Sequence, residues 1–395
     1  MKIAVLSVTK HGATLGQKLK AYYEGFKDSD VSLVCYEKEG RQSDAADAVI
    51  FSSLKPLMPD LWTTYDRLLF IMATGITVRM IAPFVQHKSV DPAVVVMDEQ
   101  AHFAISLLSG HLGGANEWTA EVAQVLGATP VITTATDVNG VPAPDVLARK
   151  LSCKVEDFTV LKEVNAALVA GETVPYYVDE SLYFVKDYID TAKAMGITLQ
   201  PLAIKNSDDE VDLWTAQLAT EGTETVETTA SLSAEDLTDD KPRVLITDRT
   251  ITVGPKTLVL RPPTMMVGVG CRRGTEAQLI SQAIESALKT AGRSPKSVVG
   301  AASVIVKADE AGLLAFCRAH GWPITFYSAE QLRALSGPFT PSPFVQSVTG
   351  VDNVCERAAV LASGGCIRIP KQAGGGVTFA LALCPYAPDW RWQNV

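Results

Sequence analysis

The residues best suited to chemistry form a glycine-rich turn in the N-terminal third of the chain. An apolar run ends at Leu108 and is followed by Ser109-Gly110-His111-Leu112-Gly113-Gly114-Ala115-Asn116. A histidine held in such a turn can act as a general base near neutral pH, because its ordinary pKa is about 6.5. It can equally be a structural histidine that hydrogen-bonds loop carbonyls. The residue types leave both interpretations open.

The neighbours of His111 suit the binding of an anion. Glycines 110, 113 and 114 permit a sharp turn and allow backbone N–H groups to approach a ligand, and a helix N-terminus attracts negative charge. Asn116 can cap the helix or hydrogen-bond a ligand. A second apolar run, Pro130 to Ile132, then leads into Thr133-Thr134-Ala135-Thr136-Asp137. Since ligands of open α/β sheets bind where strands end, we predict a binding site within residues 106–137.

Carboxylates stand at the predicted ends of other strands. Asp91 precedes the apolar run Ala93 to Met97, and Asp98-Glu99 follows it. Such acids are commonly turn formers or caps. If several of them converge with Asp137, their mutual repulsion would raise one pKa and supply a proton donor or acceptor. The candidate catalytic groups are therefore His111, Asp98, Glu99 and Asp137.

Positive groups occur at two further turns. Thr74-Gly75 opens a helical stretch that contains Arg79, and Lys88 follows it. Arg272-Arg273 follows Gly268-Val269-Gly270, and two arginines at a strand–helix turn can clamp a carboxylate or form a solvated turn. The glycines there do not complete a dinucleotide fingerprint, because the third comes one position late, at 274.

Composition narrows the class of protein. Seven cysteines form no C-x-x-C pair and five histidines lack ligand spacing, so we predict no protein-bound metal. No apolar run is long enough to span a bilayer. The net charge is −9, but residues 207–240 hold eleven acids and no Lys or Arg, so the rest of the chain carries −9 + 11 = +2. It can accept an anionic ligand, and it lacks the basic stripe of a nucleic-acid surface.

The pattern of elements predicts an α/β protein with several parts. Residues 1–150 alternate apolar strands and helices, which indicates a Rossmann-like, mostly parallel sheet covered on both faces. Residues 263–395 repeat this alternation. Residues 151–262 read as a less regular α+β middle region that includes the acidic linker 207–240.

Four N-terminal segments together resemble the cobalt-precorrin-5A hydrolases of anaerobic cobalamin biosynthesis. They are GITVRMIAP at 75–83, DPAVVVMDE at 91–99, ISLLSGHLGGAN at 105–116 and VITTATD at 131–137. The C-terminal part is also similar, most clearly from Val267 to Thr275. The chain departs from the family at Gln100-Ala101-His102, where a glycine-containing turn is expected. This departure concerns a hairpin.

The resemblance implies a hydrolase that opens the ring-A δ-lactone of a cobalt corrinoid, releases the extruded meso carbon as acetaldehyde and gives cobalt-precorrin-5B. The cobalt belongs to the substrate, so no further cofactor is expected. His111 or a strand-end carboxylate would be the base, and the N–H groups of Gly113 and Gly114 would bind the oxyanion. Carboxylate arms would be held by Arg79, Lys88, Arg272 and Arg273. The other expected substrate contacts are Thr74, Gly75, Ser109, Gly110, Asn116 and Thr134.

Two other functions stay open at this point. One is a non-catalytic corrinoid-binding or carrier protein that uses the same turns, and the other is a nucleotide- or phosphate-dependent enzyme, which lacks a complete motif. No signal peptide is evident in the N-terminal residues, so we expect a cytoplasmic location without membrane or nucleic-acid partners. A homodimer and transient contacts with methyltransferases of the pathway also stay open.

Overall fold

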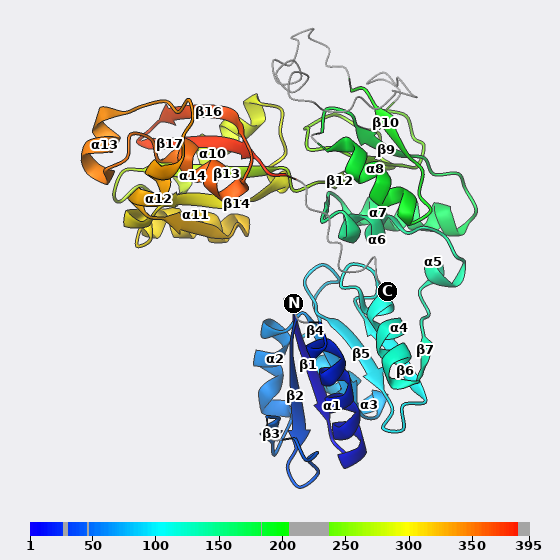
Figure 1. The fold of residues 1–395 in the computed structure, drawn as a ribbon. Coiled ribbons are helices and arrows are strands. Elements are labelled where there is room, and N and C mark those ends of the chain that lie inside the picture. The colour runs from blue at the N-terminus through cyan, green and yellow to red at the C-terminus, as the bar shows by residue number, and fades with distance from the viewer. Residues whose placement is uncertain (27–30, 46, 183, 205–236, 386–395) are drawn as a thin grey trace. The chain divides into compact units, whose positions relative to one another are not determined.

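The computed structural model describes residues 1–26, 31–45, 47–182, 184–204 and 237–385. Within these ranges the strands form three sheets (Figure 1). The chain divides into two compact units, one that contains Met1 to Arg149 and one that begins at Lys150. Most of the acidic segment 207–240 lies outside the described residues.

The first unit is built on a seven-stranded sheet in which two strands run against the others. Its order is β3-β2-β1-β4-β5-β6-β7. The strands are β1 (Lys2–Ser7), β2 (Ser32–Lys38), β3 (Val49–Phe51), β4 (Arg67–Ile71), β5 (Ala93–Met97), β6 (Phe103–Leu108) and β7 (Thr129–Val131). The first five in this order are parallel, β6 is antiparallel to β5, and β7 is parallel to β6.

Helices bury both faces of this sheet, as the continuous apolar strands predict. On one face, α1 (Lys10–Glu24) and α4 (Ala115–Leu126) pack against alternate residues of the central strands. On the other face, α2 (Met58–Thr64) and α3 (Thr74–Ile81) cover the remaining strand residues. Short helices η1 (Lys55–Leu57), α5 (Ala135–Val138) and α6 (Pro144–Lys150) occupy connections.

The reversal of β6 decides which strand ends meet. Val94 pairs with Leu108 and Met97 pairs with Ala104, so β6 ends beside the beginning of β5. The turn after β6 therefore lies at the edge where the parallel strands begin. The residues that follow β4 and β5 lie at the opposite edge.

The second unit contains two sheets. The middle sheet has the order β10-β9-β11-β12-β8, with four parallel strands and an antiparallel edge strand. Its strands are β8 (Lys154–Val155), β9 (Tyr176–Asp179), β10 (Leu199–Leu202), β11 (Arg243–Ile246) and β12 (Thr257–Arg261), with α7 (Phe158–Val169) and α8 (Val185–Ala194) among its helices. The predicted class, α/β with mostly parallel sheets, is confirmed.

The C-terminal sheet has the order β15-β14-β13-β17-β16. Three strands are parallel, namely β13 (Met265–Cys271), β14 (Val298–Val304) and β15 (Ile324–Tyr327), and β16 (Ile367–Gly374) and β17 (Val377–Leu383) complete it as an antiparallel hairpin. The helical elements are α10 (Ala277–Thr290), η2 (Pro295–Ser297), η3 (Ile305–Lys307), α11 (Ala311–His320), α12 (Ala329–Ala334), α13 (Pro343–Thr349) and α14 (Cys355–Ser363).

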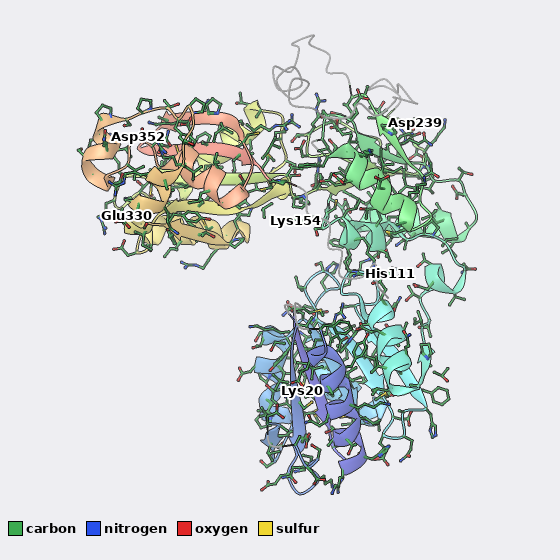
Figure 2. The ribbon with its side chains drawn as sticks, viewed as in Figure 1. Lys20, His111, Lys154, Asp239, Glu330 and Asp352 are labelled. Atoms are coloured by element: carbon green, nitrogen blue, oxygen red, sulfur yellow. The ribbon has the colours of Figure 1, made fainter. Side chains whose placement is uncertain are left out.

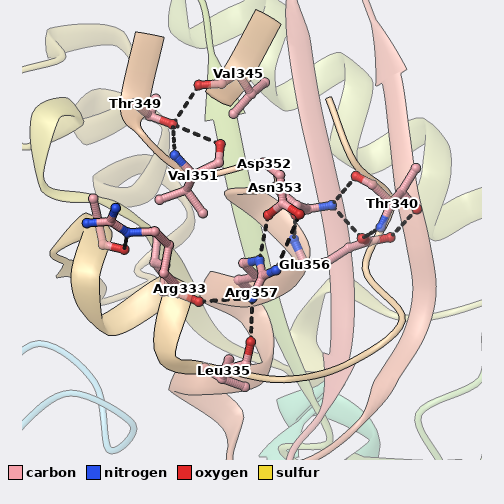
Figure 3. A network of polar contacts seen from close by, with 12 residues as sticks. Arg333, Leu335, Thr340, Val345, Thr349, Val351, Asp352, Asn353, Glu356 and Arg357 are labelled. Atoms are coloured by element: carbon pink, nitrogen blue, oxygen red, sulfur yellow. Dashed lines mark hydrogen bonds and ion pairs between the residues drawn. The ribbon is translucent and has the colours of Figure 1, made fainter. Parts of the chain in front are cut away.

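Packing explains Gly268, which lies within β13. A Cβ at Gly268 would collide with the backbone carbonyl of Cys355, so α14 can lie directly on β13 only if residue 268 is glycine. On the same helix, the buried carboxylate of Glu356 accepts hydrogen bonds from the N–H groups of Thr340 (2.6 Å) and Lys371 (2.7 Å) (Figure 3). These contacts attach the loop before α13 to the sheet.

Candidate active site

The turn after β6 closes tightly because of its glycines. Ser109 adopts a left-handed conformation (φ +58°), and its Oγ donates to the carbonyl of Asp91 at 3.1 Å. A Cβ at Gly113 would lie 2.6 Å from the Cβ of Ser109, so only glycine fits there. Gly114 precedes α4 with φ +78°. The turn folds back on itself and holds His111 at its centre.

His111 lies between two carboxylates (its position is labelled in Figure 2). Its Nε2 is 2.6 Å from Oδ2 of Asp137 on α5, and its Nδ1 is 3.0 Å from Oδ1 of Asp145 on α6. The Oγ1 of Thr136 lies 3.2 Å from Nε2. The imidazole is 8% exposed, whereas the side chain of Asp137 is 37% exposed. The cluster is therefore closed on the Nδ1 side and open to solvent at Asp137.

The two carboxylates stabilise the charged form of His111. Burial alone would lower the pKa of His111, but the contacts with Asp145 and Asp137 outweigh it and raise this pKa above its ordinary value of 6.5. Burial would likewise raise the pKa of Asp145, but His111 and Lys88 hold it below its usual 3.8. At neutral pH the imidazole thus has an increased tendency to be protonated, and in that form it donates protons.

Asn116 orients the open end of this cluster. Its Nδ2 donates to Oγ1 of Thr134 (2.9 Å) and to Oδ2 of Asp137 (3.0 Å), while its Oδ1 accepts from Oγ of Ser106 (2.6 Å). A Cβ at Gly110 would lie 2.6 Å from this Oδ1. Of the two roles considered for Asn116, its side chain therefore serves the polar cluster and does not cap α4.

Two charged residues of the cluster, Asp145 and Arg149, were not predicted. Asp145 is in the first turn of α6 and is almost fully buried. Arg149 donates from Nε to the carbonyl of His111 (2.9 Å) and pairs with Glu117 at 2.5 Å. In the sequence, Asp145 after Pro144 reads as an ordinary helix start. No local signal links either residue to a turn more than thirty positions earlier.

The structure brings together most of the predicted residues of the first unit. Lys88 joins the cluster, with Nζ 3.8 Å from Oδ2 of Asp145. The other predicted members of the cluster are Ser109, Gly110, His111, Gly113, Gly114, Asn116, Thr134 and Asp137.

The remaining predicted residues of this unit lie at the opposite edge of the sheet. Asp98 accepts from the N–H groups of Gln100 (2.9 Å) and Phe103 (2.7 Å), as a turn-forming residue does. Glu99 belongs to the same turn. The hypothesis that these two acids converge with Asp137 is wrong, because β5 ends where β6 begins.

Thr74, Gly75 and Arg79 also lie away from His111, because they follow the carboxyl end of β4. The guanidinium of Arg79 donates to the carbonyl of Gly75 at 2.9 Å, within its own helix. These three residues are therefore not part of the His111 cluster.

Arg272 and Arg273 belong to the second unit. They line an open pocket of about 550 Å³ between the turn after β13 and the glycines 375 and 376 of the β16–β17 hairpin. Arg273 donates to Oδ2 of Asp309 at 3.1 Å, and both side chains are exposed. Arg272 has no ion-pair partner within the described ranges. The two arginines thus differ, and only Arg272 presents an uncommitted guanidinium.

Neither a cluster of metal-ligating side chains nor a membrane-spanning helix is present among the described residues. The described part of the chain contains no group of three or more His, Cys, Asp or Glu side chains placed to hold a metal ion. It also contains no helix with the length and apolarity that a membrane span requires.

Models of one protein family match most of the chain. The model described as "Cobalamin synthesis G N-terminal" matches residues 56–137, "Cobalamin biosynthesis central region" matches 142–262, and "Cobalamin synthesis G C-terminus" matches 265–382. The first match contains the whole His111 turn and ends at Asp137. The third contains the turn that bears Arg272.

Individual relatives agree with these models. The chain is 31% identical over 389 residues to the cobalt-precorrin-5A hydrolase of Priestia megaterium, covering 97% of this chain and 95% of the relative. It is 32% identical over 382 residues to the enzyme of the same name from Salmonella typhimurium, covering 96% and 97%. It is also 32% identical over 121 residues to Protein CobE of Sinorhizobium sp, which covers 30% of this chain and 79% of CobE. The chain therefore belongs to the cobalamin synthesis G family, the family of the cobalt-precorrin-5A hydrolases.

Proposed function

We propose that this protein is a cobalt-precorrin-5A hydrolase. The observation that carries the proposal is the nearly full-length similarity to two hydrolases of that name. The reaction opens the ring-A δ-lactone with water and then releases the extruded carbon with its methyl group as acetaldehyde, leaving cobalt-precorrin-5B. Cobalt is part of the substrate, and we propose that the protein needs no cofactor of its own.

The His111–Asp137 pair has the chemistry for the first step. Asp137 is exposed and can take a proton from water, which attacks the lactone carbonyl. As the ester C–O bond breaks, protonated His111 can supply a proton from Nε2 to the leaving oxygen. We therefore assign Asp137 as the base and His111 as the acid, since the two carboxylates raise the pKa of His111 and favour its proton-donating form.

The second step needs the reverse proton transfer. A base removes the proton from the new hydroxyl group, the carbon–carbon bond breaks as the aldehyde C=O forms, and the electron pair passes into the macrocycle, which takes up a proton. Neutral His111, produced by the first step, can be that base, and the proton that Asp137 took from water can pass to the macrocycle. The same pair thus serves both steps and returns to its starting protonation state.

The oxyanion of the first step requires N–H donors. The N–H of Gly114 already donates to the carbonyl of His111 at 3.0 Å. The N–H of Gly113 has no hydrogen-bond partner in the part of the chain that is described. We therefore narrow the predicted oxyanion donors to Gly113.

Arg272 is the best-placed group for a carboxylate arm of the substrate. Its guanidinium lines a pocket and lacks an ion-pair partner among the described residues, whereas Arg273 is paired with Asp309. Lys88 is engaged by Asp145, and Arg79 by its own helix. We assign substrate binding to Arg272 ahead of the other three cations.

A direct assay tests the proposal. The purified full chain is incubated with cobalt-precorrin-5A, and released acetaldehyde is trapped and quantified. Stoichiometric acetaldehyde is expected. Saturable corrinoid binding without acetaldehyde would contradict the hydrolase proposal and favour the carrier alternative.

Location and partners are further parts of the proposal. We propose a cytoplasmic protein that forms a homodimer and makes transient contacts with pathway methyltransferases. Cell fractionation, sedimentation of the purified protein and crosslinking to the methyltransferases test these three statements separately. A membrane-bound fraction, a monomer at cellular concentration or absent crosslinks would contradict them in turn.

A further inference from the structure

We infer that Asp145 is a positioning residue of this active site, which fixes the imidazole of His111 so that Nε2 faces Asp137. This inference rests on the proposed function for its catalytic meaning. The structural evidence for it consists of the contacts among residues 88, 111, 137 and 145.

Asp145 is buried in a way that makes it depend on His111. Its side chain is 4% exposed, and Oδ1 has no hydrogen-bond partner within the described residues. The nearest charge to this oxygen is Nδ1 of His111 at 3.0 Å, an ion-pair contact outside hydrogen-bond geometry. Burying a carboxylate without a hydrogen bond is costly unless a cation compensates it. The imidazolium is that cation, and Lys88 at 3.8 Å from Oδ2 adds a second.

The two carboxylates around His111 are not equivalent. Asp137 is partly exposed and keeps a hydrogen bond from Asn116, so it can exchange its contact with the imidazole for one with water or substrate. Asp145 has neither solvent nor an alternative donor for Oδ1. The contact between Nδ1 of His111 and Asp145 is therefore kept throughout, and proton transfer can occur at Nε2.

The other groups around the ring do not substitute for Asp145. Thr136 and Asp137 of α5 face Nε2, and Arg149 contacts only the backbone carbonyl of His111. The charge of Arg149 is compensated by Glu117. Lys88 reaches the ring only through Asp145. Two carboxylates and one cation thus control the charge of His111.

The opposite charges of Asp145 and Lys88 predict opposite changes in the pKa of His111 when each of them is removed. Asp145→Asn keeps the shape but removes the negative charge, so the pKa of His111 falls relative to the wild type. Lys88→Met removes a positive charge beyond Asp145, so the pKa of His111 rises. A merely structural role for Asp145 predicts no such opposition, because both substitutions would only loosen the fold.

The experiment follows the imidazole directly. His111 is titrated by NMR in the full chain labelled with ¹⁵N-histidine, and its signal is identified by its loss in His111→Gln. Asp60→Asn, an exposed position in the first turn of α2, is the matched control and should titrate like the wild type. An unchanged His111 titration in Asp145→Asn overturns the inference. If that variant does not fold, Lys88→Met decides, and an unchanged or lowered pKa there overturns it.

Activity supplies a second, separate readout. In Asp145→Asn we expect kcat to fall about 10-fold or more, with its loss at high pH beginning at lower pH and KM little changed. A wild-type chain that releases no acetaldehyde would refute the proposed function while leaving the titration to judge the contacts of Asp145. A kcat profile identical to the wild type, in an active enzyme, would refute the positioning role.

Discussion

Two glycine-rich segments, the Ser109–Asn116 turn after β6 and the run that begins within β13 at Gly268, each combine glycines with a histidine or arginines and lead into a helix. Their glycines serve different purposes. After β6, the glycines admit Ser109 and Asn116 so closely that a polar cluster is buried around His111. Within β13, Gly268 allows the backbone of α14 to approach the strand, and in the turn after β13 the two arginines lie on the surface. A glycine-rich turn therefore indicates close approach, but not whether a ligand or another part of the chain approaches.

This difference supports the proposal that the first turn carries the chemistry and that Arg272 in the second turn binds a carboxylate. A buried pair of charges can be held in one geometry, whereas exposed arginines contribute attraction with little orientation. Substitutions in the two turns should accordingly separate kcat from KM.

The largest effect is expected at the reactive pair. His111→Gln and Asp137→Asn should each lower kcat about 10²-fold or more, because each removes a proton-transfer group. Steady-state acetaldehyde release measures this, and Asp60→Asn is the control. A kcat within twofold of the wild type for both variants would show that His111 has only a structural role. The chemistry would then not lie in the turn after β6.

The next largest effect is on the free energy of unfolding when a glycine in either turn is replaced by alanine. Gly113→Ala should destabilise the protein by about 1–3 kcal/mol, because the new Cβ would lie 2.6 Å from that of Ser109. Gly274→Ala, whose Cβ meets nothing within 4 Å, should cost only about 1 kcal/mol for its positive φ. Chemical denaturation compares the two variants. Equal destabilisation would show that the β6 turn is no tighter than the β13 turn.

A smaller effect is expected from the surface arginines. Arg272→Gln should raise KM about 10-fold, or 1.4 kcal/mol, with little change in kcat, because it removes an uncommitted charge from the pocket. Arg273→Gln is the matched control and should raise KM less than about twofold, since an exposed pair with Asp309 contributes little. A larger effect at Arg273 than at Arg272 would reverse the assignment.

The smallest effect is on stability as pH changes. The pKa of folded His111 is raised, so its stabilisation is complete below its unfolded pKa near 6.5 and is lost as pH rises through the folded value. The pKa of Asp145 is lowered, so its contribution is lost only as pH falls through its own folded value, which lies below 3.8. The free energy of unfolding should thus decline above pH 6.5 more in the wild type than in His111→Gln. Parallel declines would contradict the ion-pair description.

Local patterns were enough for much of this protein. Continuous apolar strands between helical stretches predict sheets covered on both faces, since each strand must bury both its sides. The Ser109–Asn116 turn, Asp137 and the family motifs were also readable, because the residues that carry them are close together in the chain. His111 and Asp137 were both recognised as candidates for this reason.

Other features depended on strand direction and long-range packing. Asp98 and Glu99 have the same type and strand-end position as Asp137, yet the reversal of β6 places them at the opposite edge. Asp145 and Arg149 look like ordinary helix residues, and only the fold of α6 against the turn brings them to His111. Residue types and spacing along the chain thus identified His111 and Asp137 as candidate catalytic residues. The strand order and the burial of Asp145, which no local pattern encodes, determined which groups meet and in which direction the pKa values of His111 and Asp145 shift.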